Sequence, residues 1–173
     1  MHAASDGALV IMFSDIEGHT PLVERLGDDG WMVLLREHNA LVRQQLSAHG
    51  GHEVKSEGDG FMVVFSDPHR ALHCATAIQS ALAARNATAE QPLRVRIGLH
   101  AGNCVREDGD FYGRNVILAS RIAGQAKGGE IVVSAPLRDL AGNGGAFVFD
   151  DGQDTALKGL SGTHRIHRIE LPR

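Results

Sequence analysis

The 173-residue sequence has little cysteine, little excess positive charge and no long apolar run. Its two cysteines, Cys74 and Cys104, are too few for a disulfide framework, and free thiols suit a reducing compartment. The net charge of −4 comes with no basic stripe, which argues against binding to nucleic-acid phosphates. Apolar runs reach about six residues, far short of a membrane span, and the residues MHAASDG show no signal-peptide pattern. We therefore expect a cytoplasmic protein with no membrane insertion and no nucleic-acid partner.

Glycine, in contrast, is frequent, with 21 of 173 residues, and much of it marks turns such as Gly50-Gly51 and Gly128-Gly129. The length fits one domain with a sizeable core. No internal repeat, low-complexity tract or long linker divides the chain. We therefore expect a single domain over residues 1–173.

The order of the predicted elements indicates an α+β sandwich of ferredoxin-like type, βαββαβ, with additional helices and strands. The continuous apolar run before Asp15 predicts a central strand that is buried on both faces. Strands are predicted at 8–15, 52–56, 61–65, 93–102, 103–106 and 130–134, with edge strands at 147–151 and 164–171. Helices are predicted at 20–27, 29–49, from Pro68 onward, at 114–126 and at 136–141.

Two aspartates at the ends of apolar runs are the first candidates for chemistry. Asp15 follows ALVIMF within FSDIEGHT, and Asp59 precedes FMVVF within VKSEGDGF. Each has a simpler interpretation, because Asp15 could cap a helix and Asp59 could serve the EGDG turn. Both flank strands that are expected to be neighbours, however, and oxygen ligands suit hard divalent cations. The pair therefore indicates a metal site of the kind that promotes displacement at phosphorus.

Four motifs in this order resemble the class III nucleotidyl cyclase homology domain, the catalytic domain of adenylyl and guanylyl cyclases. They are FSDIEGHT (13–20), VKSEGDGF (54–61), RIGLHAG (96–102) and DFYGRNVILASRI (110–122). The resemblance covers about residues 8–170 and is similar to the bacterial branch with a short dimerisation arm. It implies a head-to-tail homodimer with two active sites at the interface.

The resemblance also implies which residues bind metal and phosphate. Asp15 and Asp59 of one subunit would hold two Mg²⁺ or Mn²⁺ ions, helped by the carbonyl of Ile16. The backbone amides of Glu17, Gly18, His19 and Thr20 would cradle the β- and γ-phosphates of the substrate, which suits free N–H groups at a helix start.

Lys55 and Asp110 match the pair that reads adenine in adenylyl cyclases. A lysine ammonium can serve the ring acceptor of adenine, and a carboxylate can accept from its amino group, whereas guanine presents the opposite pattern. Alone, Lys55 could be an exposed strand lysine and Asp110 a turn or cap residue. Together they favour ATP as the substrate and disfavour guanylyl cyclase activity.

Arg121 matches the arginine that steadies the phosphates during transfer. Its simpler interpretation is a solvated arginine on a helix surface. Lys158, in the LKGLS loop, is the candidate for a phosphate-contacting lysine.

The chain departs from the family at Ile117, where an asparagine usually contacts the ribose. Asn115 points about 160° away from residue 117 on an ideal helix and is no simple replacement. Losing one preorganised donor costs a factor of ~10²–10³ in turnover, which predicts a slow or inactive enzyme.

His19 is a second departure, at a position where an apolar or small hydroxyl residue is common. Its side chain either adds pH-dependent charge near the triphosphate or simply faces solvent.

Two functions remain open. One is an adenylyl cyclase that converts ATP to 3′,5′-cyclic AMP and pyrophosphate. The alternative is a weak or silent cyclase-homology module that binds nucleotide or dimerises for regulation.

Overall fold

The computed structural model describes residues 8–142 and 144–171. Among these residues, no helix has the length and apolarity needed to cross a membrane. The helices and strands follow in the order β1 (Leu9–Ile16), α1 (His19–Ala48), β2 (His52–Glu57), β3 (Gly60–Phe65), α2 (Pro68–Asn86), β4 (Val95–Gly102), β5 (Val105–Glu107), β6 (Asp110–Tyr112), α3 (Arg114–Ala123), β7 (Ile131–Ser134), α4 (Ala135–Ala141), β8 (Gln153–Ala156) and β9 (Thr163–Arg168).

The main sheet has seven strands in the order β2-β3-β1-β4-β7-β9-β8. Its first four strands alternate in direction and have the order of a ferredoxin-like fold, which confirms the predicted fold class. β1 is central, with β3 on one side and β4 on the other. β7 then runs parallel to β4 and extends the sheet.

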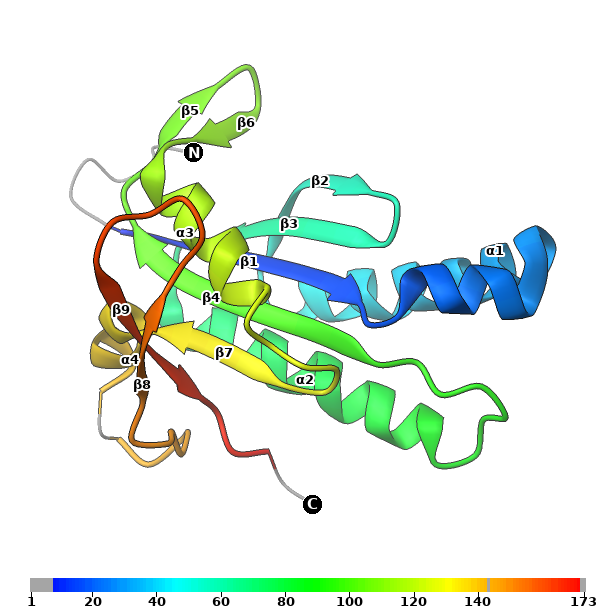
Figure 1. The fold of residues 1–173 in the computed structure, drawn as a ribbon. Helices are drawn as coiled ribbons and strands as arrows, with labels where there is room; N and C mark the ends of the chain where they lie inside the picture. Colours follow the sequence, from blue (N-terminus) through cyan, green and yellow to red (C-terminus); the bar gives the residue numbers. More distant parts are fainter. Residues whose placement is uncertain (1–7, 143, 172–173) are drawn as a thin grey trace.

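Helices cover both faces of this sheet (Figure 1): α1 and α2 lie on one face and α3 on the other. The side chains of β1 alternate between the two layers. Val10 and Met12 belong to the larger core beneath α1 and α2, and Leu9 and Ile11 to a smaller core that includes Ala119 of α3. The central strand is therefore buried on both faces, as its unbroken apolar run predicts.

Two glycines of β4 let α3 lie close to the sheet. A Cβ at Gly98 would come within 2.3 Å of the Ala123 backbone, and one at Gly102 within 2.4 Å of the Asn115 side chain. Only a residue without a side chain fits at such a distance. This close approach fixes the position of α3, which carries Ile117 and Arg121.

The break predicted between helices at 20–27 and 29–49 is confirmed, because α1 is kinked at Gly27, whose φ of 72° and ψ of 172° are not helical. Other predicted boundaries are wrong in detail. The helix predicted at 114–126 ends at Ala123, because the amides of Gln125 and Ala126 bond to carbonyls only three residues back. The strand predicted at 103–106 is β5, which pairs with β6 in a hairpin of its own.

The prediction for the C-terminal strands is wrong at residues 147–151. Apart from one isolated bridge from Phe149 to Ile169, this segment is not a strand, and the edge of the sheet is β8 instead. Two backbone hydrogen bonds, from the Asp150 amide to the Arg168 carbonyl and from the Glu170 amide to the Val148 carbonyl, accompany this bridge, and Phe147 and Phe149 pack against the larger core. Asp150 Oδ1 accepts hydrogen bonds from the amides of Gly152 and Arg168, both at 3.0 Å, and turns the chain. The edge strand predicted at 164–171 is β9, which is an inner strand between β7 and β8.

Candidate active site

The predicted metal aspartates lie at the same end of two neighbouring strands. Asp15 is the penultimate residue of β1, and Asp59 lies in the turn between β2 and β3. Ser14 pairs with Phe61 across β1 and β3, so the end of β1 meets the start of β3. Both aspartates line one cavity of about 440 Å³, together with residues 16–21. The structure therefore brings together two motifs that are far apart in the sequence.

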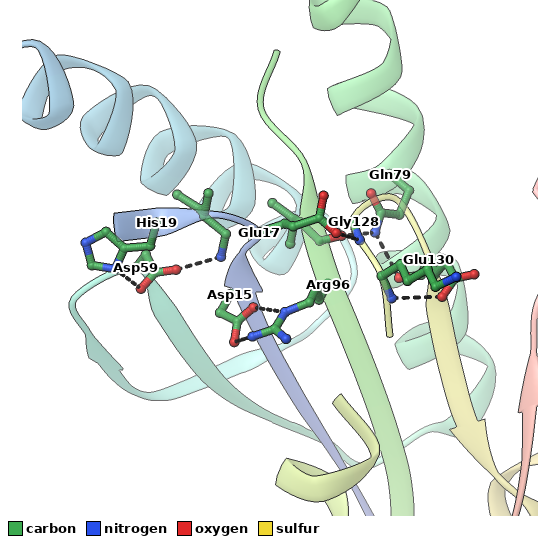
Figure 2. A network of polar contacts seen from close by, with 11 residues as sticks. Asp15, Glu17, His19, Asp59, Gln79, Arg96, Gly128 and Glu130 are labelled. Atoms are coloured by element: carbon green, nitrogen blue, oxygen red, sulfur yellow. Dashed lines mark hydrogen bonds and ion pairs between the residues drawn. The ribbon is translucent and has the colours of Figure 1, made fainter. Parts of the chain in front are cut away.

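Asp59 is held by two contacts in this cavity (Figure 2). Its Oδ2 accepts a 2.7 Å hydrogen bond from the amide of Ile16, and its Oδ1 lies 3.2 Å from Nδ1 of His19. The imidazole of His19 in turn stacks on Trp31, with ring centroids 4.5 Å apart and planes 15° from parallel. His19 is therefore oriented toward a candidate metal ligand and packed on an aromatic ring, rather than simply facing solvent.

Asp15 makes a bidentate ion pair with Arg96, an arginine that the sequence analysis did not single out. Arg96 Nε and a terminal nitrogen donate to the two oxygens of Asp15, both at 2.7 Å (Figure 2). Asp15 and Arg96 are direct cross-strand partners of β1 and β4. The hydrogen bonds to Asp15 raise the pKa of the Arg96 guanidinium above its ordinary value.

The loop between β1 and α1 presents backbone donors to the same cavity. Gly18 adopts a left-handed conformation, φ 71° and ψ 34°, at the N-cap of α1 and supplies no side-chain cap. The amides of Gly18, His19 and Thr20 make no hydrogen bond within residues 8–142 and 144–171. The amide of Glu17 was predicted to join them, but it already donates to the Arg94 carbonyl at 2.8 Å. Three amides therefore remain for an anion at this helix start.

Lys55 and Asp110 meet across the second part of the site, on β2 and β6. Lys55 Nζ lies 2.9 Å from Asp110 Oδ2, and Asp110 Oδ1 accepts a 2.7 Å hydrogen bond from the Phe111 amide. The lysine contact, followed by that amide, lowers the pKa of Asp110, and Asp110 raises the pKa of Lys55. Within the subunit, Lys55 also lines a cavity of about 220 Å³ together with Asp15, one of the two candidate metal ligands.

α3 presents the remaining candidates. Arg121 Nε donates to the carbonyl of Lys158 at 3.0 Å, so the predicted arginine and the LKGLS loop are neighbours. Ile117, one turn earlier, has 46% of its surface exposed. It can therefore face a ligand or a second subunit.

Asn115 cannot replace the missing asparagine, because both ends of its amide are engaged. Its Oδ1 lies 2.8 Å from His100 Nε2, and its Nδ2 donates to the carbonyl of Asn103 at 2.8 Å. The other nitrogen of His100, Nδ1, lies 2.7 Å from the hydroxyl of Ser134. Burial lowers the pKa of His100, so the imidazole is neutral at pH 7. These contacts hold α3 against the sheet, which is a structural role.

The donor set fits hard divalent cations, although the described residues contain no group of three His, Cys, Asp or Glu side chains able to hold one. Asp15 and Asp59 supply two carboxylates at one cavity, but Arg96 occupies both oxygens of Asp15. Because a carboxylate offers about four lone-pair sites, this ion pair leaves about two sites on Asp15 for a cation.

A ferredoxin-like sheet with paired carboxylates beside a helix start that offers free amides fits phosphate-ester chemistry. Residues 1–170 match the family model of the adenylate and guanylate cyclase catalytic domain. Among curated proteins, an adenylate cyclase of Mycosarcoma maydis is 34% identical over 167 residues. That match covers 82% of this chain and 7% of the fungal protein, so the chain spans a small part of its relative.

Solved structures agree with this assignment. The adenylyl cyclase CyaB from P. aeruginosa has a TM-score of 0.84 at 26% identity, with 96% of this chain and 95% of that chain covered. The guanylate cyclase domain of RhGC from Catenaria anguillulae in complex with GTP has a TM-score of 0.81 at 20% identity, covering 96% and 98%. The chain belongs to the adenylate and guanylate cyclase catalytic domain family. Solved structures of an adenylyl cyclase and of a guanylate cyclase domain both share its fold.

Proposed function

We propose that the chain is an adenylyl cyclase domain that converts ATP to 3′,5′-cyclic AMP and pyrophosphate. The observation that carries this proposal is the Lys55–Asp110 pair, whose ammonium and carboxylate lie 2.9 Å apart. Adenine offers an acceptor at its ring nitrogen and a donor at its amino group. An ammonium and a carboxylate held side by side match that pattern, and the reversed pattern of guanine does not suit them.

The residues at the other end of the site bind and orient the triphosphate. Asp15 and Asp59 would hold two Mg²⁺ or Mn²⁺ ions, assisted by the carbonyl of Ile16, while the amides of Gly18, His19 and Thr20 take the β- and γ-phosphates. When bound, the two cations activate the ribose 3′-hydroxyl and stabilise charge at the α-phosphate as pyrophosphate leaves. Arg121 supplies a further positive charge to the phosphates during transfer.

We also propose that the domain acts as a head-to-tail homodimer with Asp15 and Arg121 of each site on different subunits. Exposed apolar side chains support a partner. Val105 and Tyr112 are cross-strand neighbours of the β5–β6 hairpin, 61% and 53% exposed, and Ile117 of α3, the helix that follows the hairpin, is 46% exposed. Adjacent exposed apolar residues such as Val105 and Tyr112 are typical of an interaction surface. Figure 1 shows the hairpin extending beyond the main sheet, where a partner can reach it.

The base-reading roles are tested by exchanging the two residues together. In the double variant Lys55→Glu and Asp110→Cys, we expect the ratio of kcat/KM for ATP to that for GTP to fall by at least about tenfold, because the adenine-matching contacts are lost. A matched control removes the exposed Arg43–Glu53 ion pair, 2.9 Å, which involves the same strand but lines no site cavity. An ATP to GTP ratio that stays at the wild-type value in the double variant refutes the assignment.

A further inference from the structure

We infer that the side-chain amine of Lys127 contacts the substrate triphosphate from the same subunit that supplies Asp15 and Asp59. This inference rests on the proposed nucleotide cyclase function and names a residue that the family motifs do not. Lys127 lies in the loop between α3 and β7, more than a hundred residues after Asp15. It nevertheless lines the same cavity of about 440 Å³ as Asp15, Asp59 and the amides at the start of α1.

The loop that carries Lys127 is fixed to the phosphate-binding end of the sheet. The Gly128 amide donates to Oε2 of Glu17 at 2.5 Å, and Figure 2 shows this link between the loop and the end of β1. The Gly129 amide donates to the carbonyl of Val95 at 2.9 Å. A Cβ at Gly128 would come within 2.7 Å of Arg94 Cβ and 2.8 Å of the Glu17 carboxyl group, so a larger residue here would displace its neighbours.

The carbonyl of Glu130 holds the other side of the loop. It accepts a 3.1 Å hydrogen bond from Nε2 of Gln79 and a 3.2 Å hydrogen bond from the amide of Ile97. The side chain of Glu130 also accepts from the Lys127 amide at 2.8 Å. Since the backbone on both sides is tied down, the base of the Lys127 side chain has a defined position beside the cavity.

The amine of Lys127 is available for a ligand. Its side chain is exposed, and within the described part of the chain it forms no ion pair or hydrogen bond. Arg96, the other cation in the cavity lining, is paired with Asp15 through two 2.7 Å contacts. A polyanionic triphosphate entering this cavity therefore meets Lys127 as its unpaired cation. The flexible stem and strong point charge of lysine suit phosphate binding.

The distribution of lysine in the chain supports this assignment. Only three of the 17 lysine and arginine residues are lysines: Lys55, Lys127 and Lys158. Lys55 contacts Asp110, and the carbonyl of Lys158 accepts from Arg121, so the other two lie at the candidate site. With so few amines, lysine-directed chemistry can report on each one separately.

The direct test uses acyl-phosphate derivatives of ATP and GTP, which acylate a lysine amine near the terminal phosphate, followed by mass spectrometry of the three lysine peptides. We expect Lys127 to be labelled by the ATP derivative and protected by excess inorganic triphosphate. If inorganic triphosphate protects Lys158 from labelling and Lys127 is not labelled, the inference is overturned and the proposed function stands. Absence of any protected label contradicts both. Protected labelling of Lys127 by the GTP derivative alone supports the inference and contradicts the proposed choice of base.

Kinetics of variants give a second, independent test. Lys127→Ala should raise KM for ATP about tenfold with a smaller change in kcat, as expected for a lost ground-state phosphate contact, and Lys127→Arg should restore most of the affinity. Arg94→Ala is the matched control, because Arg94 is an exposed cation near Gly128 that does not line the cavity. Equal changes in KM for Lys127→Ala and Arg94→Ala overturn the inference.

Discussion

Replacing Ile117 by asparagine is expected to raise kcat by about 10², with little change in KM for ATP. The position lies one helical turn before Arg121, and the side chain is 46% exposed, so it can reach a ligand. The resemblance to the family implies an asparagine here that contacts the ribose in the transition state. A preorganised donor of this kind is worth a factor of ~10²–10³ in turnover. Because its contact strengthens in the transition state, kcat should change more than KM.

The control for this substitution is Ile117→Leu, which keeps the position apolar and without a donor. It should leave kcat within about threefold of the wild type, since leucine and isoleucine are similar in volume. Equal rates in the asparagine and leucine variants would contradict the role of this position. The same pair of variants addresses the silent-module alternative, because a domain that lacks only this donor should gain measurable activity in Ile117→Asn.

Mixing Asp15→Ala and Arg121→Ala subunits is expected to restore activity that neither variant has alone. In a head-to-tail dimer with shared sites, each hybrid has one site with both defects and one intact site. After complete exchange at equal amounts, about a quarter of the wild-type activity should return, because about half of the dimers are hybrids. Cyclic-nucleotide production before and after mixing, with hybrid formation shown by differently tagged subunits, is the measurement.

Two further mixtures make the result specific. At ATP concentrations well below KM, where Lys127→Ala alone is weak, its activity should rise on mixing with Arg121→Ala and not on mixing with Asp15→Ala, because Lys127 and Asp15 belong to the same half of a site. Lys55→Ala should behave in the opposite way and recover with Asp15→Ala. No recovery in the Asp15→Ala and Arg121→Ala mixture, in spite of proven hybrids, counts against sites shared between subunits.

The parts of the fold and of the candidate site that the sequence predicted are those that local sequence patterns determine. The buried strand before Asp15 and the hairpin around Asp59 are visible as apolar runs and turns, and the ferredoxin-like strand order places them side by side. The Lys55–Asp110 contact followed from the resemblance, since nothing local relates β2 to β6. Asn115 was correctly excluded as a substitute because helix geometry alone fixes its direction.

The parts that it missed depend on long-range packing. The Asp15–Arg96 ion pair requires the register of β1 against β4, which no pattern in either strand reveals. The stacking of His19 on Trp31 spans the kink at Gly27 and depends on its geometry. Phe147 and Phe149 alternate like a strand, but they pack on the core and belong to no strand. In each case, a partner distant in sequence decides the structure.

The most direct test of the central claim is cyclic-nucleotide production from ATP and from GTP, with Mg²⁺ or Mn²⁺, in the wild type and in Asp15→Ala. We predict cyclic AMP from ATP, little or no cyclic GMP from GTP, and loss of the product in Asp15→Ala, which removes a carboxylate at the cavity of the candidate metal site. No product from either nucleotide, in folded and dimeric protein, would contradict the account and leave a cyclase-homology module without catalytic activity.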